Sequence, residues 1–252
     1  MSLSMNLTGR RIVVTGASSG IGEAVCRSLV KFGASVVMLA RRQERLDAVS
    51  TDLGNRAVGI SCDVTNLAAL EMAIGQAAER FGNIDAVIAV AGRGMVGSIH
   101  TGSPEAWREL MDLNLIGPLA TVRYAVGHFP KEGRRDIVFV GSTGGITPMP
   151  GVGIYGATKR GLRAAFDTMR LEVADMGVNT SLVMPGMFLT EGLTEGVAFS
   201  GDFPPSDMPM FASGGGPASP KPLADAVAFM LALPEGVCIN EMVIRPTGQL
   251  NP

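Results

Sequence analysis

The stretch RIVVTGASSGIG, residues 11–22, joins a short apolar run to a glycine-rich turn. Arg11 to Thr15 is rich in β-branched residues and predicts a buried strand, and the helical apolar period after the turn predicts a helix. Gly16, Gly20 and Gly22 permit a tight turn and a close approach of the backbone to a ligand. A helix N-terminus adds free amide donors and a partial positive charge. The stretch therefore predicts a strand, a phosphate-binding turn and a helix.

Short apolar runs alternate with amphipathic stretches along most of the chain, which is the pattern of β-α-β units. The runs are almost continuously apolar, as expected for strands covered by helices on both faces. We therefore predict an α/β fold with a doubly wound, parallel, seven-stranded sheet in a single domain over residues 1–252. The expected strands are Arg11 to Thr15, Ser35 to Ala40, Ala57 to Cys62, Asp85 to Ala91, Asp136 to Val140, Asn179 to Met184 and Glu241 to Arg245.

The composition argues against several classes of partner. Charged residues make up 17% of the 252 residues and the formal net charge is -2, so no basic field points to nucleic acid or an anionic membrane. The longest clean apolar run, Ala226 to Leu233, is far shorter than a membrane span, and no signal sequence is evident. The cysteines are isolated, so we expect neither disulfides nor a metal site. A cytoplasmic protein with a small-molecule ligand is predicted.

Residues 141–159, GSTGGITPMPGVGIYGATK, hold a hydroxyl, a phenol and an ammonium. Tyr155 and Lys159 are four residues apart, so on a helix they share one face. An adjacent ammonium lowers the pKa of a phenol, which makes Tyr155 a candidate general acid or base. Ser142 ends an apolar run, and the Gly/Pro-rich segment after it can turn the chain back toward Tyr155. An isolated Y-x-x-x-K is also common on solvated helix faces, so the assignment depends on the glycine turn and the motifs below.

The end of the second expected strand indicates which nicotinamide cofactor binds. The sequence there is Leu39-Ala40-Arg41-Arg42, with no carboxylate to bond the ribose hydroxyls of NAD. Guanidinium groups favour the 2′-phosphate of NADP(H) instead, and Ser18 and Ser19 can add hydroxyl contacts. Of the two arginines, we expect Arg41 to bind the phosphate and Arg42 to be a solvated residue in the first turn of the next helix.

Two further segments bear on the ligand. Asp63-Val64, after the third strand, is placed to contact an adenine ring or to cap the following helix. Residues 186–220 are too long and irregular for an ordinary connection. They are either a poorly ordered surface excursion or a mobile substrate lid. The lid residues expected to line an apolar substrate pocket are Met187, Phe188, Phe199, Phe203, Met208 and Phe211.

Taken together, these motifs resemble the short-chain dehydrogenase/reductase family over essentially the whole chain. The resemblance rests on TGASSGIG, Asp63-Val64, Asn114 before Gly117, Ser142 thirteen residues before Tyr155, YGATK, and Pro185-Gly186 followed by Thr190. It implies a Rossmann fold with sheet order 3-2-1-4-5-6-7 and an oxidoreductase acting on a secondary alcohol or ketone. From the C-terminal INEMVIRPTGQ it also implies a homo-oligomer, for which a tetramer is favoured and a dimer is the alternative.

The resemblance also implies residue roles. Tyr155 is expected to exchange the proton, Lys159 to lower its pKa and bond the ribose, Ser142 to hold the substrate oxygen, and Asn114 to hold a water that links Lys159 to solvent. The cofactor-binding residues expected are Gly16, Ser18, Ser19, Gly20, Ile21, Gly22, Arg41, Arg42, Asp63, Val64, Ala91, Gly92, Tyr155, Lys159, Pro185, Gly186 and Thr190.

Two departures from the family pattern stand out. Ala89-Val90-Ala91-Gly92 replaces the usual Asn-Asn-Ala-Gly, which removes side-chain hydrogen bonds expected to tie the central sheet together, and Gly141 stands where a serine is common. The alternatives to an NADP(H)-linked enzyme are an NAD-linked dehydrogenase, against which the arginines argue, and a dinucleotide-binding redox sensor with little catalysis.

Overall fold

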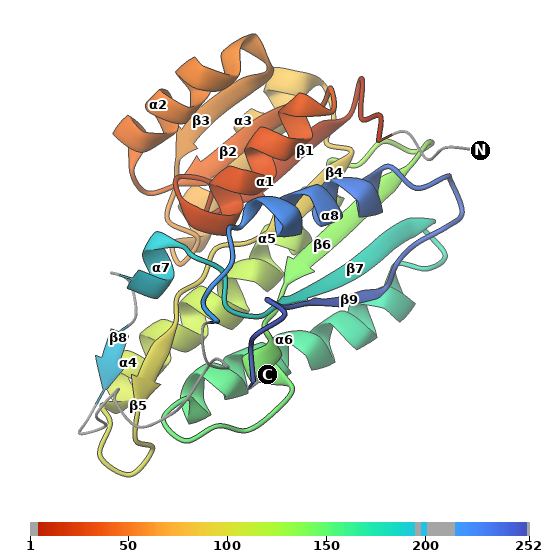
Figure 1. Cartoon of the computed structure of the whole chain (residues 1–252). Coiled ribbons are helices and arrows are strands. Elements are labelled where there is room, and N and C mark those ends of the chain that lie inside the picture. Colours follow the sequence, from red (N-terminus) through yellow and green to blue (C-terminus); the bar gives the residue numbers. More distant parts are fainter. Residues whose placement is uncertain (1–4, 195–197, 201–214, 251–252) are drawn as a thin grey trace.

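The computed structural model describes residues 5–194, 198–200 and 215–250 of the chain. Its centre is a parallel sheet of seven strands in the order β3-β2-β1-β4-β6-β7-β9 (Figure 1). Counted within this sheet alone, that is the predicted order 3-2-1-4-5-6-7. The strands are β1 (Arg11–Thr15), β2 (Ser35–Ala40), β3 (Ala57–Ser61), β4 (Ala86–Ala89), β6 (Arg135–Val140), β7 (Val178–Pro185) and β9 (Glu241–Ile244).

Strand β4 ends two residues earlier than expected. The hydroxyl oxygen of Thr15, on neighbouring β1, accepts hydrogen bonds from the backbone N–H groups of Val90 (3.1 Å) and Ala91 (3.2 Å). These two amides are therefore satisfied by a side chain, outside the ladder of the sheet. The buried Thr15 thus links β1 to the residues after β4, next to the positions where the resemblance led us to expect asparagines.

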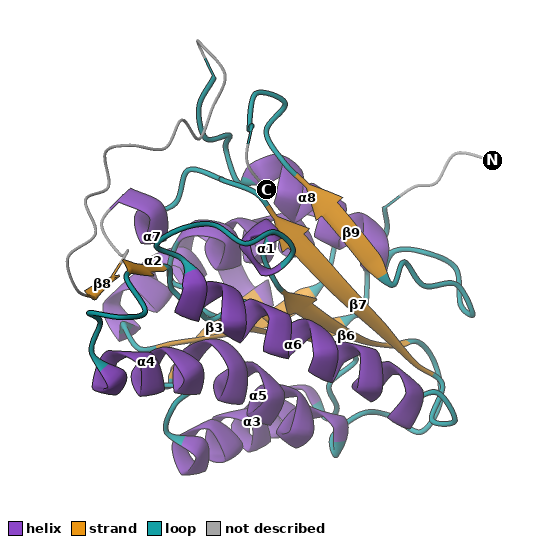
Figure 2. Ribbon diagram, turned by 90° about the horizontal axis from the view of Figure 1, so that it is seen from below, coloured by secondary structure: helices purple, strands orange, loops and turns teal. Residues whose placement is uncertain are grey.

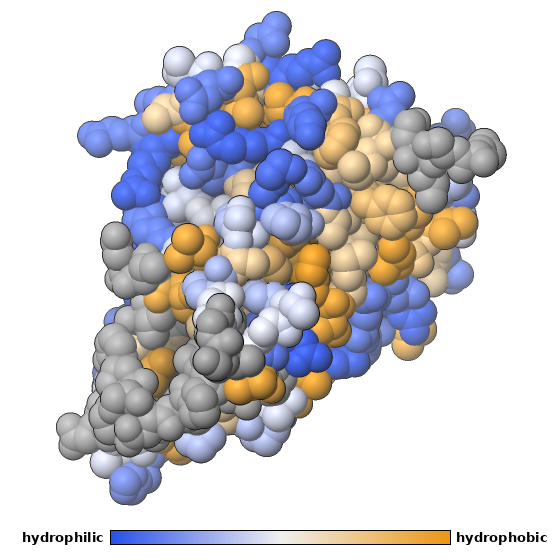
Figure 3. Space-filling view, viewed as in Figure 1, coloured by the Kyte–Doolittle hydropathy of each residue, from blue (hydrophilic) through white to orange (hydrophobic). Residues whose placement is uncertain are grey.

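Helices cover both faces of the sheet, and the alternation of strand residues creates two cores. Ile12 and Val14 of β1 face α1, α2 and α8, while Val13 faces α3, α5 and α6 (Figure 2). The helices are α1 (Gly20–Lys31), α2 (Gln43–Leu53), α3 (Leu67–Phe81), α4 (Pro104–Met111), α5 (Gly117–Val126), α6 (Gly153–Glu172), α7 (Glu191–Thr194) and α8 (Lys221–Leu231). Figure 3 shows hydrophilic side chains gathered over α1 and α2 on the outer face of the first layer.

Local sequence signals fix several helix starts. The Ser103 side chain accepts from the backbone N–H of Ala106, and Pro104 occupies the first turn of α4, as expected for a capped start. Asn66 caps α3 in the same way, through the N–H of Ala69. Between α4 and α5, residues Asp112–Ile116 form a π-helical turn, a feature that occurs frequently at functional sites.

A second, two-stranded parallel sheet lies outside the main one. Strands β5 (Met95–Gly97) and β8 (Ala198–Ser200) pair beside α4, joining the segment after β4 to the segment after α7 (Figure 1). Neither strand was predicted from the sequence. The described part of the expected lid therefore contains a short helix and a strand in addition to irregular chain.

Candidate active site

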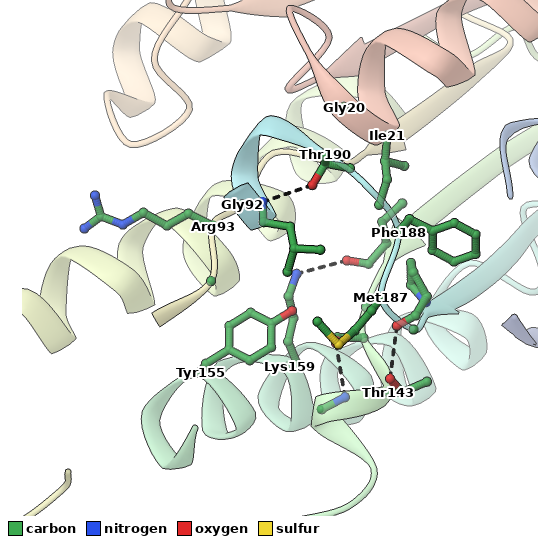
Figure 4. Close-up of a pocket in the computed structure, with 18 of the residues that line it drawn as sticks. Gly20, Ile21, Gly92, Arg93, Thr143, Tyr155, Lys159, Met187, Phe188 and Thr190 are labelled. Carbon is green, nitrogen blue, oxygen red and sulfur yellow. Dashed lines mark hydrogen bonds between the residues drawn. The ribbon is translucent and has the colours of Figure 1, made fainter. Parts of the chain in front are cut away.

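Tyr155 and Lys159 occupy the same face of α6, one turn apart, as their spacing predicts. The side chain of Lys159 is buried, and its Nζ atom donates a hydrogen bond of 3.1 Å to the carbonyl oxygen of Val140, at the end of β6. The same Nζ atom lies 6.0 Å from the centroid of the Tyr155 ring (Figure 4). The end of the strand therefore fixes the ammonium close to the phenol.

Burial governs the acid–base properties of this pair. It lowers the pKa of Lys159 to about 8, because desolvation disfavours the ammonium. It also raises the pKa of Tyr155, and the hydroxyl of Ser142 lowers that pKa only in part. The expected lowering of the phenol pKa is therefore not what this structure shows, because desolvation of the phenol dominates.

Ser142 faces Tyr155 because a tight turn follows β6. Its hydroxyl oxygen accepts a 3.1 Å hydrogen bond from the backbone N–H of Gly144. A Cβ atom at Gly144 would lie 3.2 Å from the Tyr155 ring and 3.5 Å from the Ser142 hydroxyl, so a glycine lets the turn approach both side chains closely. The structure thus places the predicted hydroxyl and phenol at one site.

Asn114 lies in the π-helical turn and is fully buried. Its side chain makes two hydrogen bonds to the backbone of Arg93, accepting from the N–H and donating to the carbonyl, each 2.9 Å long. A Cβ atom at Gly92 would lie 3.0 Å from Oδ1 of Asn114 and 3.5 Å from Nζ of Lys159. Asn114 therefore stands on the same side of Gly92 as Lys159, and it holds the chain after β4 in place.

The three glycines of the turn after β1 are packed too tightly to carry a side chain. A Cβ atom at Gly16 would lie 2.9 Å from Cα of Ala91, and one at Gly22 only 2.1 Å from the carbonyl oxygen of Gly16. Gly20 begins α1 with a φ of 58° and leaves room for Thr190, whose Cβ would lie 3.0 Å from an added methyl group. These glycines also line the cavity described below, so a ligand there can reach the backbone at the N-terminus of α1.

The positively charged end of this site differs from the expectation. Arg41 and Arg42 are both exposed. One guanidinium nitrogen of Arg42 lies 3.0 Å from the hydroxyl of Ser19 and 3.3 Å from that of Ser18. Arg42 immediately precedes α2, and its extended backbone directs the side chain to the glycine turn. The structure thus brings Arg42, which we expected to be solvated only, beside the glycine turn, and which arginine binds a phosphate stays a prediction.

Asp63 takes part in a local turn, where one carboxylate oxygen accepts from the backbone N–H (3.0 Å) and the hydroxyl (2.8 Å) of Thr65. The cap of α3 is Asn66, so the expectation that Asp63 caps this helix is wrong. Val64 is buried and would contact a Cβ atom at Gly117. Asp63 and Val64 hold the chain after β3 in a fixed turn.

A cavity of about 340 Å³ lies at the carboxyl ends of the central strands and connects the glycine turn with Tyr155. Six of the predicted site residues do not line this cavity: Ser18, Arg41, Arg42, Asp63, Val64 and Asn114. The predicted residues that line it are Gly16, Ser19, Gly20, Ile21, Gly22, Ala91, Gly92, Ser142, Tyr155, Lys159, Pro185, Gly186 and Thr190.

The rest of the wall is largely apolar. Met187 and Phe188 line the cavity as predicted. In Figure 4 the Phe188 ring lies away from Tyr155, toward the core of the first layer. Phe199 belongs to β8, while Phe203, Met208 and Phe211 lie outside the described residues. The lining residues that sequence reasoning missed include Met95, Val96, Met149, Val152, Leu193 and Gln249.

Gln249 had no motif to signal it. Its side-chain oxygen accepts a 2.8 Å hydrogen bond from the backbone N–H of Met187, so the C-terminal tail fixes the start of the segment after β7. A Cβ atom at Gly186 would lie 2.2 Å from that oxygen, which explains the glycine. This contact joins residues far apart in the chain, and only the tertiary structure reveals it.

Comparisons with known proteins identify the family of the chain. The family model described as short chain dehydrogenase matches residues 10–198. An uncharacterized oxidoreductase of Staphylococcus epidermidis is 32% identical over 93% of this chain and 96% of its own. An alcohol dehydrogenase from Thermococcus sibiricus, complexed with 5-hydroxy-NADP, superposes with a TM-score of 0.83 at 28% identity, covering 96% of this chain and 99% of its own. A metagenomic short-chain oxidoreductase in complex with NADP gives 0.79 at 29% identity, covering 97% and 99%.

The chain therefore belongs to the short-chain dehydrogenase/reductase family and has the fold of an oxidoreductase that binds a nicotinamide dinucleotide. Within the described ranges, no helix is long and apolar enough to cross a membrane. No group of three histidine, cysteine, aspartate or glutamate side chains in those ranges is arranged to hold a metal ion.

Proposed function

We propose that the protein is an NADP(H)-dependent oxidoreductase that interconverts a secondary alcohol and a ketone. The observation that carries the proposal is one cavity with Ser142, Tyr155 and Lys159 at one end and the bare glycine turn at the other. A dinucleotide is long enough to need both ends, with its pyrophosphate at the helix N-terminus.

The residues fit such a cofactor. Gly16, Gly20, Gly22 and Ala91 line the cavity, so a ligand in it can approach the bare backbone of the glycine turn. The α1 terminus and Ser19 would hold the pyrophosphate, Ala91, Gly92 and Lys159 the nicotinamide ribose, and Pro185, Gly186 and Thr190 the nicotinamide. When bound, this cofactor supplies or accepts a hydride.

The chain's own groups move the proton. In the direction of reduction, Tyr155 donates its phenolic proton to the carbonyl oxygen of the substrate, which the hydroxyl of Ser142 holds and polarises. Lys159 stabilises the resulting phenolate, and Asn114 keeps the chain after β4 in position for a relay between Lys159 and solvent. In oxidation the same phenolate removes the proton from the alcohol.

The preference for NADP(H) is supported by Arg42, Ser18 and Ser19, which together form an anion site beside the glycine turn. Two solved relatives with NADP-type ligands lend it further support. An NAD-linked dehydrogenase is the second candidate, and one observation favours it: the carboxylate of Glu191 pairs with Arg42 and partly neutralises that site. In a redox sensor the candidate catalytic residues would not turn over a substrate. Among the described residues, no contact blocks Ser142 or Tyr155 from the cavity that they line.

The apolar wall favours a substrate with a hydrocarbon portion next to its carbonyl group. Met149, Val152, Met187 and Leu193 line the cavity together with Tyr155. We further propose a single-domain, cytoplasmic enzyme that assembles as a homotetramer, with residues 186–220 acting as the substrate lid.

The test is fluorescence titration of the purified protein with NADPH and NADH, followed by a panel of ketones and alcohols. We expect tighter binding of NADPH, a preference that is lost in Arg42→Ala, and turnover of at least one apolar ketone. Preference for NADH would favour the NAD-linked alternative. Tight binding of either cofactor without turnover of any panel member would count against catalysis and for a sensor.

A further inference from the structure

Ion pairs join the short helix α7 to the start of α2. The carboxylate of Glu191 forms a bidentate ion pair with Arg42, with N–O distances of 2.6 and 3.1 Å, and a second ion pair of 2.6 Å with Arg45. Arg42 immediately precedes α2 and Arg45 lies in its first turn, whereas Glu191 begins α7, in the segment after β7. The ion pairs therefore join two segments that are far apart in the sequence.

The same guanidinium faces the glycine turn. Its Nη2 atom, which is bonded to Glu191, also lies 3.0 Å from the Ser19 hydroxyl and 3.3 Å from the Ser18 hydroxyl. Arg42, Arg45 and Ser19 thus surround one anion, which in this structure is the Glu191 carboxylate, and Ser18 contacts the same Arg42 guanidinium. The Arg42 guanidinium, as a strong donor pair, holds the pKa of Glu191 down at about 2, so the carboxylate stays charged throughout the physiological range.

Glu191 is held at this place by its neighbours. Thr190 packs over the glycine turn, because a Cβ atom added at Gly20 would lie 3.0 Å from the Cβ atom of Thr190. The side-chain and main-chain oxygens of Thr190 both accept from the backbone N–H of Leu193 (3.2 and 2.9 Å), which orders the turn that carries Glu191. The carboxylate therefore meets Arg42 through a structured segment.

We infer that Glu191 is an internal competitor of the cofactor's 2′-phosphate and is therefore a determinant of cofactor specificity. The inference rests on the proposed function, in which a nicotinamide dinucleotide lies along the glycine turn. A phosphate binds a guanidinium in the same fork as a carboxylate does, and two anions at one fork repel each other. A 2′-phosphate must displace Glu191 from Arg42, whereas a ribose with a free 2′-hydroxyl leaves the ion pair in place.

The inference predicts that the substitution of Glu191 changes the affinity for only one of two simple probes that lack the nicotinamide. Adenosine 2′,5′-bisphosphate carries the extra phosphate, and adenosine 5′-monophosphate does not. In Glu191→Gln the competing charge is absent, so we expect affinity for the bisphosphate to rise roughly fivefold, the value of an exposed ion pair, while affinity for the monophosphate is unchanged. Isothermal titration calorimetry on the whole protein measures both without any turnover.

The matched control is Asp52→Asn. Asp52 is also an exposed acid paired with an arginine, Arg27, at 3.0 Å, and its removal changes the net charge by the same amount. We expect Asp52→Asn to leave both affinities as they are, which separates competition at Arg42 from a general change of charge. An equal change for both probes in Glu191→Gln, or no change, would overturn the inference.

The cofactor proposal stands or falls on a different comparison, the preference of the unaltered protein for one probe over the other. If the unaltered protein shows no preference for the bisphosphate but Glu191→Gln does, the inference holds and the NADP(H) proposal fails. If both proteins prefer the bisphosphate to the same degree, the NADP(H) proposal holds and the inference fails.

Discussion

The ammonium of Lys159 donates a 3.1 Å hydrogen bond to the carbonyl oxygen of Val140, the last residue of β6. This bond places a buried positive charge 6.0 Å from the ring of Tyr155, with Ser142 two residues beyond Val140. The end of β6 therefore positions both Ser142 and the ammonium of Lys159, while α6 carries Lys159 and Tyr155. The relationship explains why both the strand and the helix are needed for an active site.

Replacing Tyr155 with phenylalanine removes the proton donor and keeps the ring. We expect kcat/KM for ketone reduction to fall by ~100-fold or more, because general acid catalysis typically contributes at least that factor. Cofactor affinity, measured by fluorescence titration, should stay within about twofold, because the glycine turn and Lys159, to which we assign cofactor contacts, are unchanged. A twofold change is smaller than the value of one hydrogen bond. Turnover that survives the substitution would refute the assigned role of Tyr155.

The buried Lys159 should make stability depend on pH at the alkaline end. Its pKa is about 8 in the folded protein against 10.5 for an ordinary lysine, so between these values the unfolded state binds more protons. The free energy of unfolding should therefore rise with pH across that window, by roughly 2–4 kcal/mol from this group. Below pH 8 the group is protonated in both states and its contribution is constant.

The check is a comparison with Lys159→Met, which keeps the length of the side chain and cannot titrate. Urea unfolding of the two proteins at several values from pH 8 to pH 10.5 gives the difference in the free energy of unfolding. We expect that difference to change steadily in favour of the unaltered protein as the pH rises. A difference that is constant with pH would show that Lys159 titrates normally.

Thr15 should matter more than a strand threonine usually does. Its buried hydroxyl accepts from two backbone amides, those of Val90 and Ala91. Thr15→Val keeps the shape but leaves both donors without this acceptor, at a cost of about 1–3 kcal/mol for each buried group. We expect a lower midpoint of denaturant unfolding and weaker cofactor binding, because Ala91 lines the cavity. Thr15→Ser restores the hydroxyl and should recover most of the loss.

Two glycine-to-alanine substitutions should have opposite effects. At Gly22 the new Cβ would lie 2.1 Å from the carbonyl oxygen of Gly16, so the glycine turn must deform and cofactor binding should be lost. At Gly75, inside α3, no atom lies within 4 Å of the added Cβ, and alanine should stabilise the helix by up to ~1 kcal/mol. Thermal unfolding and cofactor titration of both variants measure the two effects. Retained binding in Gly22→Ala would contradict the packing described here.

Much of the fold was predictable because it depends on local patterns. The seven apolar runs correspond to seven strands, and the capping serine and proline of α4 lie where the sequence indicates. Strand β4 was predicted too long, because the amides of Val90 and Ala91 are taken by Thr15 on another strand. The β5–β8 pair was missed, because three-residue strands joined across about a hundred residues give no periodic signal.

The sequence alone indicated the family, because its motifs are residue types at fixed spacing along one strand, one turn or one helix. The resemblance to that family then implied the sheet order, which the structure confirms, and the candidate catalytic set. Only the tertiary structure decided which arginine faces the glycine turn, how Glu191 and Gln249 reach the cavity, and how burial shifts the pKa values of Tyr155 and Lys159. Those properties arise from groups that are distant in the chain and from the exclusion of water around them. Spacing along the sequence carries no information about either.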